Sequence, residues 1–183
     1  MTNNKAKQRL LLHICCAPDA TIPWPSLLED YDVTGFFYGS NIHPLDEYER
    51  RLGAVEILRD SLSGLVVFPP YEPEVWHKAT YGFENEPEGG ARCTVCFQEQ
   101  FKATAKYAAS HNFDCITTTL TISPHKNVKL INEIGNKVAT QYGLKWLDFV
   151  WRKNNGFLAS IKRSKELGLY RQNYCGCVWS KKS

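Results

Sequence analysis

Six of the seven cysteines in this 183-residue chain stand in three short groups whose spacing suits metal binding. The groups are an adjacent pair, a C-x-x-C pair and a C-x-C pair: Cys15 and Cys16, Cys93 and Cys96, and Cys175 and Cys177. Thiolates bind zinc and iron-sulfur clusters, and they also exchange disulfides. Because nothing in the sequence directs export and 43% of the residues are hydrophobic, enough for a real core, the grouped cysteines are predicted to be metal ligands or redox groups.

Three kinds of chemistry remain open on the cysteines alone. A tetrahedral zinc site and a 4Fe-4S cluster each take four ligands, whereas a thiol-disulfide exchanger built on Cys93 and Cys96 leaves four cysteines unexplained. Ligand type alone does not decide between the two metals. Six thiols together with Asp19 exceed the needs of one zinc ion or one cluster, which indicates a cluster with an additional iron ion beside it. Cys115 begins an apolar run and is predicted to be a buried structural residue.

The elements that must position these groups alternate between short apolar runs and longer stretches of helical periodicity. The apolar runs predict five strands, at residues 10–16, 33–38, 65–68, 115–120 and 145–150. Apolar side chains at helical spacing predict helices over residues 48–58, 97–108 and 128–142. This alternation predicts an α/β fold with a largely parallel sheet. No repeat or linker interrupts it, so residues 1–183 are predicted to form a single globular domain.

Polar and thiol side chains follow three of the predicted strands. Ligands of open parallel sheets bind beyond the carboxyl ends of the strands, so these side chains are expected to meet at one rim. They follow the first, second and fourth strands: Cys15, Cys16 and Asp19, then Asn41 and His43, then His125. His43 and His125 each stand beside a proline and are candidate proton donors, with an ordinary structural role as the alternative. His13 and His111 are expected to be structural.

The C-terminal segment, residues 151–183, is strongly basic. It holds eight basic side chains and one acidic side chain, so it carries +7 while the rest of the chain carries −4. Clustered positive charge suits a polyanion such as nucleic acid, and a solvated basic face is the alternative. Arg171 and the aromatic side chains Tyr170, Tyr174 and Trp179 flank the last cysteine pair. This mixture suits a base stacked on an aromatic or guanidinium plane, and packing of the aromatics onto the sheet is the alternative.

The sequence contains no run close to the roughly 18 apolar residues of a membrane span. The apolar stretch at residues 10–14 is too short for the core of a signal peptide, which has roughly 7 to 15 residues. The protein is therefore predicted to be cytoplasmic, with no membrane partner.

Six short sequence motifs lie at the predicted rim and around the cysteine groups. They are LLHICCAP (11–18), FFY (36–38), NIHP (41–44) with Glu47, Tyr48 and Arg51, RC and CF (92–97), TTTLTISPHKN (117–127) and GLYRQNYCGC (168–177). In this order they resemble the QueH family of epoxyqueuosine reductases over nearly the whole chain. Six motifs in the order of the family support this resemblance.

The resemblance implies conversion of epoxyqueuosine to queuosine at the wobble position of a tRNA anticodon, the final step of queuosine biosynthesis, without cobalamin. It also implies a Rossmann-like sheet of the adenine-nucleotide alpha hydrolase (HUP) type with a C-terminal metal-binding segment. Many members of that superfamily bind ATP through a glycine-rich loop after the first strand, but this chain has no glycine before Gly35, so ATP is not expected. The same motifs contain the predicted substrate-binding residues, which are Tyr38, Asn41, Arg171 and Tyr174.

Deoxygenation of an epoxide to an alkene needs two electrons and two protons and releases the oxygen as water, which calls for a redox metal. The hypothesis is a 4Fe-4S cluster that supplies electrons singly from an external donor, beside an additional iron, held partly by Asp19, that acts as a Lewis acid. The six grouped cysteines and Asp19 are the predicted metal ligands, and protons are expected from water, His43 or His125. The predicted catalytic residues are therefore Asp19, His43 and His125. The alternative is a zinc-stabilised tRNA-binding module without redox activity.

Overall fold

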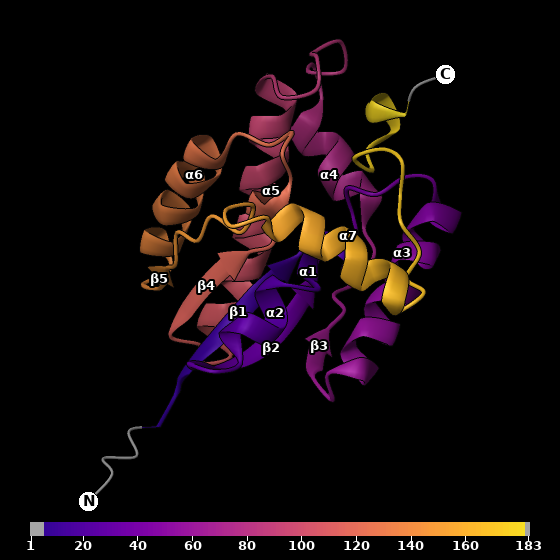
Figure 1. Cartoon of the computed structure of the whole chain (residues 1–183). Helices are drawn as coiled ribbons and strands as arrows, with labels where there is room; N and C mark the ends of the chain where they lie inside the picture. Colours follow the sequence, from indigo (N-terminus) through magenta and orange to yellow (C-terminus); the bar gives the residue numbers. More distant parts are fainter. Residues whose placement is uncertain (1–5, 182–183) are drawn as a thin grey trace, which may run out of the picture.

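The computed structural model describes residues 6–181 and contains a five-stranded sheet in which all paired strands run parallel (Figure 1). The strands lie in the order β3-β2-β1-β4-β5. Their bounds are β1 Gln8–Ile14, β2 Tyr31–Phe37, β3 Leu65–Val67, β4 Cys115–Thr118 and β5 Lys145–Trp146. The expected Rossmann-like parallel sheet of five strands is therefore confirmed.

Helices cover both faces of this sheet (Figure 1). They are α1 Ala17–Ala20, α2 Pro23–Leu27, α3 Leu45–Ser61, α4 Pro73–Thr80, α5 Ala91–Ser110, α6 Val128–Gln141 and α7 Gly156–Glu166. On one face α2 and α3 pack against β1 and β2, and on the other α5 and α6 pack against β1, β4 and β5. No helix within residues 6–181 combines the length and the apolar character that crossing a bilayer requires.

The central strand β1 is buried on both faces, as is typical of parallel sheets whose two faces are covered by helices. One face packs against α2 and α3 through Leu10, Leu12 and Ile14. On the opposite face, Leu11 packs toward α5 and α6, and His13 Nδ1 lies 2.8 Å from Thr118 Oγ1. Burial lowers the pKa of His13 to about 3, so this histidine is neutral and structural, as predicted.

The strand predicted at residues 115–120 ends two residues early. The amide of Thr119 donates a hydrogen bond to the His13 carbonyl at 3.0 Å, and a 3-10 turn, Leu120–Ile122, follows at once. The apolar run continues through this turn because the turn is itself buried. Burial, rather than strand pairing, therefore explains the last residues of the run.

Of the strand predicted at residues 145–150, only residues 145–146 form β5, which is an edge strand of the sheet. The amide of Leu147 adds one more hydrogen bond to β4. The chain then leaves the sheet, and Trp151 Nε1 donates to the carbonyl of Thr118 at 3.1 Å. These residues cover the carboxyl end of β4 instead of extending the edge.

Strands β1 and β4 are neighbours although the chain visits β2 and β3 between them. The chain runs outward from β1 to β3 on one side and then continues through β4 and β5 on the other. At such a switch point the loops after the two central strands diverge and leave a crevice in which ligands bind. Here the loop after β1 begins with Cys15, and the segment after β4 leads to His125 and Lys126.

Candidate metal centre and substrate cavity

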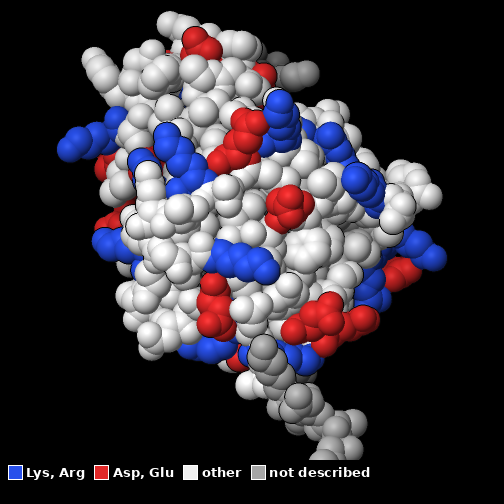
Figure 2. Space-filling model, turned by 90° about the vertical axis from the view of Figure 1, so that its left-hand side faces the viewer, with Lys and Arg blue, Asp and Glu red and all other residues white. Residues whose placement is uncertain are grey.

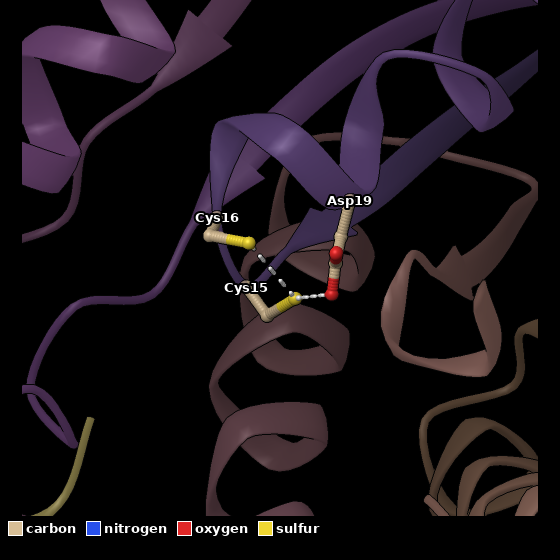
Figure 3. A group of neighbouring side chains, drawn as sticks. All are labelled: Cys15, Cys16 and Asp19. Carbon is tan, nitrogen blue, oxygen red and sulfur yellow. Dashed lines mark hydrogen bonds between the residues drawn. The ribbon is translucent and has the colours of Figure 1, made fainter. Parts of the chain in front are cut away.

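The loop after β1 brings two thiols and a carboxylate together (Figure 3). Because β1 ends at Ile14 and α1 begins at Ala17, the chain turns sharply and the Asp19 side chain points back toward the sulfurs. Cys15 Sγ lies 3.4 Å from Asp19 Oδ2 and 4.0 Å from Cys16 Sγ. The three ligand atoms all lie within 4.8 Å of one another. We call Cys15, Cys16 and Asp19 the strand-end group.

The spacing of the strand-end group suits a single metal ion. Tetrahedral ligands about 2.0–2.3 Å from an ion lie roughly 3.3–3.8 Å from one another, close to the distances found here. The hydrogen bond with Cys16, together with burial, raises the pKa of the Cys15 thiol, and burial raises the pKa of Asp19. A bound cation opposes both shifts, because positive charge stabilises thiolate and carboxylate.

Side chains from two other segments reach the sulfurs of the strand-end group. Thr119, just beyond β4, accepts a hydrogen bond from the Cys15 amide at 3.3 Å, and its Oγ1 lies 3.3 Å from Cys15 Sγ. Gln172 Nε2 donates to Cys16 Sγ at 2.9 Å. The group is therefore held by β1, by the end of β4 and by the C-terminal segment.

The other four grouped cysteines come together from two segments far apart in the sequence. We call Cys93, Cys96, Cys175 and Cys177 the four-cysteine group. Cys93 and Cys96 lie in the first two turns of α5. Burial raises the pKa of Cys96, and the charges of the other three thiols, which lie near it, raise this pKa further. Cys96 and Cys177 pack together against Trp76.

Uncharged N–H donors surround the α5 half of this group. Cys96 Sγ accepts from Trp76 Nε1 at 3.2 Å and from Gln100 Nε2 at 3.0 Å. Cys93 Sγ accepts from the Gly89 amide at 3.2 Å. Such donors favour the thiolate form, which is the form that binds metal.

The two groups differ in spacing. Within residues 6–181, the strand-end group is the one set of three or more Cys, His, Asp or Glu side chains whose ligand atoms all lie within 4.8 Å of one another. The four-cysteine group is therefore spread more widely than the ligands of one ion. A cluster of four irons keeps its cysteine sulfurs farther apart than a single ion does, so the wider spacing fits a cluster.

A buried ion pair on α3 holds the C-terminal segment in place. Arg51 Nε lies 2.8 Å from Glu47 Oε1, with side chains 2% and 1% exposed. The two terminal nitrogens of Arg51 donate to the main-chain oxygens of Cys175 at 2.9 Å and Tyr174 at 3.1 Å. Gly176 has a φ of 134°, and a Cβ there would lie 3.0 Å from Arg51 Nη1, which explains the glycine between the two cysteines.

A cavity of about 810 Å³ borders both groups. Cys15 and Asp19 line it from the strand-end group, and Cys175 lines it from the four-cysteine group. Its cationic lining residues outnumber the acidic ones, Asp19 and Glu88, and they are Arg51, Lys126, Arg171 and Lys181. The volume lies within the roughly 300–1,000 Å³ typical of small-ligand sites.

The predicted substrate-binding and proton-donor residues fall into two sets. Three of them line the cavity: His125, Arg171 and Tyr174. The other three are buried and do not line it: Tyr38, Asn41 and His43. Tyr38 belongs to the same core cluster as Cys93. The structure therefore brings only half of these predicted residues to the cavity that borders the thiols.

His43 lies outside the cavity in an aromatic cluster. Its ring centroid lies 4.5 Å from that of His77 and 5.1 Å from that of Trp76. Burial, aided by the charge of His77, lowers the pKa of His43 to about 4. Its main chain holds the C-terminal segment, because its amide donates to the Gly176 carbonyl at 2.8 Å and its carbonyl accepts from the Tyr174 hydroxyl.

Cys115 is fully buried at the start of β4, as predicted for a structural cysteine. Burial raises the pKa of its thiol to about 11. It belongs to the core cluster on the α2 and α3 side of the sheet and contributes to neither metal-ligand group.

The molecular surface carries mixed charge. Figure 2 shows the side of the molecule on which α6 and β5 lie, where Lys and Arg are interspersed with Asp and Glu. Exposed cations of the basic C-terminal segment include Lys162, Arg163 and Lys165 on α7, although Arg163 also pairs with Glu166 at 3.2 Å. The segment therefore presents positive charge on α7 as well as at the cavity.

Sequence reasoning assigned no role to four residues that contact the groups, which are Arg51, Thr119, Lys126 and Gln172. All four belong to the sequence motifs that resemble the QueH family, and this membership is the sequence signal that could have identified them. Their hydrogen-bond partners within the two groups lie 49 to 156 residues away in the chain. Contacts over such separations depend on the fold and have no local sequence pattern.

Residues 10–183 match the family described as Epoxyqueuosine reductase QueH. A protein of that name from Streptococcus pyogenes serotype M1 is 41% identical over 179 residues, which span 94% of this chain and 70% of the relative. Another from Thermotoga maritima is 37% identical over 174 residues, spanning 93% and 89%. The solved U34-tRNA thiolase NcsA from Methanococcus maripaludis, with its 4Fe-4S cluster, has a TM-score of 0.64 at 11% identity over 97% of this chain and 63% of the thiolase, and this likeness concerns the fold alone. This chain belongs to the epoxyqueuosine reductase QueH family.

Proposed function

We propose that this protein is an epoxyqueuosine reductase, an oxidoreductase that converts epoxyqueuosine to queuosine in the anticodon of tRNA. The observation that carries the proposal is a cavity that borders both the strand-end group, which is spaced for a single ion, and the four-cysteine group, which is spaced more widely. Membership of the family favours this function over a zinc-stabilised module without redox activity. We further propose that the chain acts as one catalytic domain in the cytoplasm.

The four-cysteine group is proposed to hold a 4Fe-4S cluster, and the strand-end group an additional iron. Four thiols satisfy such a cluster, whereas two thiols and a carboxylate leave room for substrate at an ion. When bound, these groups supply electrons one at a time and a Lewis acid for the epoxide oxygen. The proposal includes no ATP, because the loop after β1 carries cysteines where a phosphate cradle needs glycines. It includes no cobalamin, as the resemblance to the QueH family implies.

The reaction consumes two electrons from an external donor and two protons, and the epoxide oxygen leaves as water. His125 is exposed and lines the cavity, so it is proposed to pass protons between water and the substrate. His43 makes no contact with the cavity, and its proposed role is to hold the C-terminal segment through its main chain. Asp19 is proposed to fix the additional iron at the cavity wall.

Substrate binding is proposed to rest on Arg171 and Tyr174, which line the cavity and offer a guanidinium and an aromatic plane on which an extruded base stacks. The cationic lining suits the flanking phosphates. Tyr38 and Asn41 do not line the cavity, so direct contact with the substrate is not proposed for them.

The test is an anaerobic turnover assay with tRNA that carries epoxyqueuosine and a chemical reductant, followed by digestion to nucleosides and mass spectrometry. Wild-type protein is expected to form queuosine, and Asp19→Ala is expected to form none. The matched control is Asp32→Ala, which removes an exposed carboxylate from β2 and should leave turnover intact. A colourless protein that contains stoichiometric zinc, binds tRNA and forms no queuosine would overturn the proposal in favour of the zinc-stabilised module.

A further inference from the structure

One sulfur of the four-cysteine group has a charged hydrogen-bond donor. Lys126 Nζ lies 3.1 Å from Cys175 Sγ and 3.0 Å from Glu88 Oε1. The Lys126 side chain is only 10% exposed, although it lines the cavity. A long cationic side chain is therefore held between a thiol and a carboxylate at the wall of the cavity.

The other sulfurs have different surroundings. The hydrogen bonds to Cys93 and Cys96 come from an amide, an indole and a carboxamide, which carry no net charge. Among the hydrogen bonds that residues 6–181 make to the sulfurs of the four-cysteine group, the ammonium of Lys126 is the charged donor, and it acts on the cavity side. The charge is thus placed on the half of the group that faces the strand-end group.

The main chain around Lys126 is held by hydrogen bonds. Asn127, the next residue, caps α6 by accepting a hydrogen bond from the Leu130 amide at 3.1 Å. The carbonyl of Lys126 accepts from Arg152 Nη1 at 3.0 Å. The main chain is therefore held on both sides of Lys126, which fixes the point from which its side chain reaches Cys175.

We propose that Lys126 is a positioning residue that sets the reduction potential of the cluster through Cys175. The inference rests on the proposed function, because it needs Cys175 to be a thiolate ligand of a cluster. Net charge and hydrogen bonds to the sulfurs set cluster potentials. A cation that donates to a ligand sulfur stabilises the reduced cluster, which carries one more negative charge, and so raises the potential. Glu88 opposes this effect by offsetting part of the ammonium charge.

The experiment is a redox titration of anaerobically reconstituted protein, followed by electron paramagnetic resonance or visible absorption. Lys126→Met keeps the length of the side chain and removes its charge, so the midpoint potential should become more negative than that of the wild type. Lys126→Arg keeps the charge and should stay closer to the wild type. Glu88→Gln leaves the ammonium unopposed and should shift the potential in the positive direction.

The matched control is Lys129→Met, which makes the same chemical change on a side chain that is 87% exposed at the start of α6. A shift with Lys129→Met as large as that with Lys126→Met would overturn the inference, since it would reduce the effect to net charge. If Lys126→Met fails to retain a cluster, the sign of the Glu88→Gln shift decides: a positive shift supports the inference and an unchanged potential overturns it. Wild-type protein without iron and sulfide would overturn the proposed function as well, whereas a cluster whose potential ignores all these changes overturns this inference alone.

Discussion

The two metal-ligand groups are assembled in different ways. The strand-end group lies within residues 15–19, and its geometry follows from the end of β1 and the turn into α1. The four-cysteine group joins the start of α5 to the C-terminal segment, and this segment is held by hydrogen bonds that the Arg51 side chain donates to its main-chain oxygens. One group is therefore local, and the other depends on a long-range contact.

Because the two groups are assembled differently, we expect that a mutation can disrupt one of them and leave the other intact. A change that releases the C-terminal segment removes Cys175 and Cys177 from the four-cysteine group and leaves the ligands of the strand-end group at the end of the buried central strand. A change at Asp19 alters the strand-end group alone.

The largest effect is expected from Arg51→Met. It should destabilise the protein by about 3 kcal/mol, because it removes one partner of a buried ion pair and leaves Glu47 with Arg50 and Tyr170 alone. It should also release the cluster iron. Urea unfolding and iron analysis measure both effects. The control is Arg50→Met, which touches the same Glu47 but is 51% exposed and should cost less than about 1 kcal/mol. Full stability and full cluster content in Arg51→Met would show that the segment docks without the ion pair.

The next effect concerns metal content. Cys96→Ser should remove the cluster iron and sulfide, because it deletes a buried thiol whose thiolate form two N–H donors favour, while the strand-end group keeps all its ligands. Anaerobic reconstitution followed by iron and sulfide analysis provides the measurement. Cys115→Ser is the matched control, since this buried thiol belongs to neither group. Equal iron in the two variants would remove Cys96 from the proposed ligand set.

Asp19→Asn should keep the cluster absorption and lose turnover by more than about 100-fold, the upper end of the cost of removing a residue that merely supports a metal ligand. The amide retains the shape of the side chain and loses its charge, so the change isolates the anionic ligand. Turnover of tRNA carrying epoxyqueuosine, measured at equal cluster content, gives the result. Wild-type turnover would mean that the two groups do not cooperate in the reaction.

Acid should loosen the long-range contact. Burial alone would raise the pKa of Glu47, but hydrogen bonds from Tyr170, Arg51 and Arg50 outweigh it and lower this pKa below its ordinary value of 4.5. The ion pair therefore adds stability above the unfolded-state pKa, and this stability is lost as the pH falls through the lowered pKa of the folded state. Unfolding free energies of the metal-free protein should fall more steeply with acid in the wild type than in Glu47→Gln. Parallel pH profiles would contradict this role of Glu47.

The smallest effect is expected on α7. Reversing the charges of Lys162, Arg163 and Lys165 should weaken tRNA binding, and it should flatten the salt dependence by about 0.7–0.9 in logarithmic slope for each phosphate that is no longer neutralised. Binding titrations at two salt concentrations measure this, and the visible spectrum should stay unchanged. Reversal of Lys106 and Lys137, exposed on α5 and α6, serves as the control. Equal affinities for all variants would show that the α7 cations form an ordinary solvated face that does not bind tRNA.

The strand-end group could be predicted from the sequence because its residues are contiguous and follow an apolar run that has to be a buried strand. The short helices before β2 could not be predicted, since α2 contains Pro23 and Pro25 within five residues and shows no repeating apolar stripe. The extent of β5 was overestimated because apolar residues after Trp146 are buried by covering β4 rather than by pairing.

The four-cysteine group could be predicted only as a set of thiols. Its assembly depends on the hydrogen bond between Arg51 and Cys175 across 124 residues, which no local pattern signals. The same reason explains why His43 was expected at the cavity. It follows β2 as the rim rule requires, but β2 is one strand removed from the switch point between β1 and β4, so its loop meets α4 and the C-terminal segment instead.

The central claim is that a cluster and a separate iron lie in two different ligand groups beside one cavity. Mössbauer spectroscopy, with iron and acid-labile sulfide analysis, on anaerobically reconstituted wild type and Asp19→Ala tests this most directly. The wild type is predicted to contain one iron more than sulfide per chain, with a spectral signal distinct from that of the cluster, and Asp19→Ala is predicted to lose that signal alone. Equal iron and sulfide in a fully active wild type would contradict the claim.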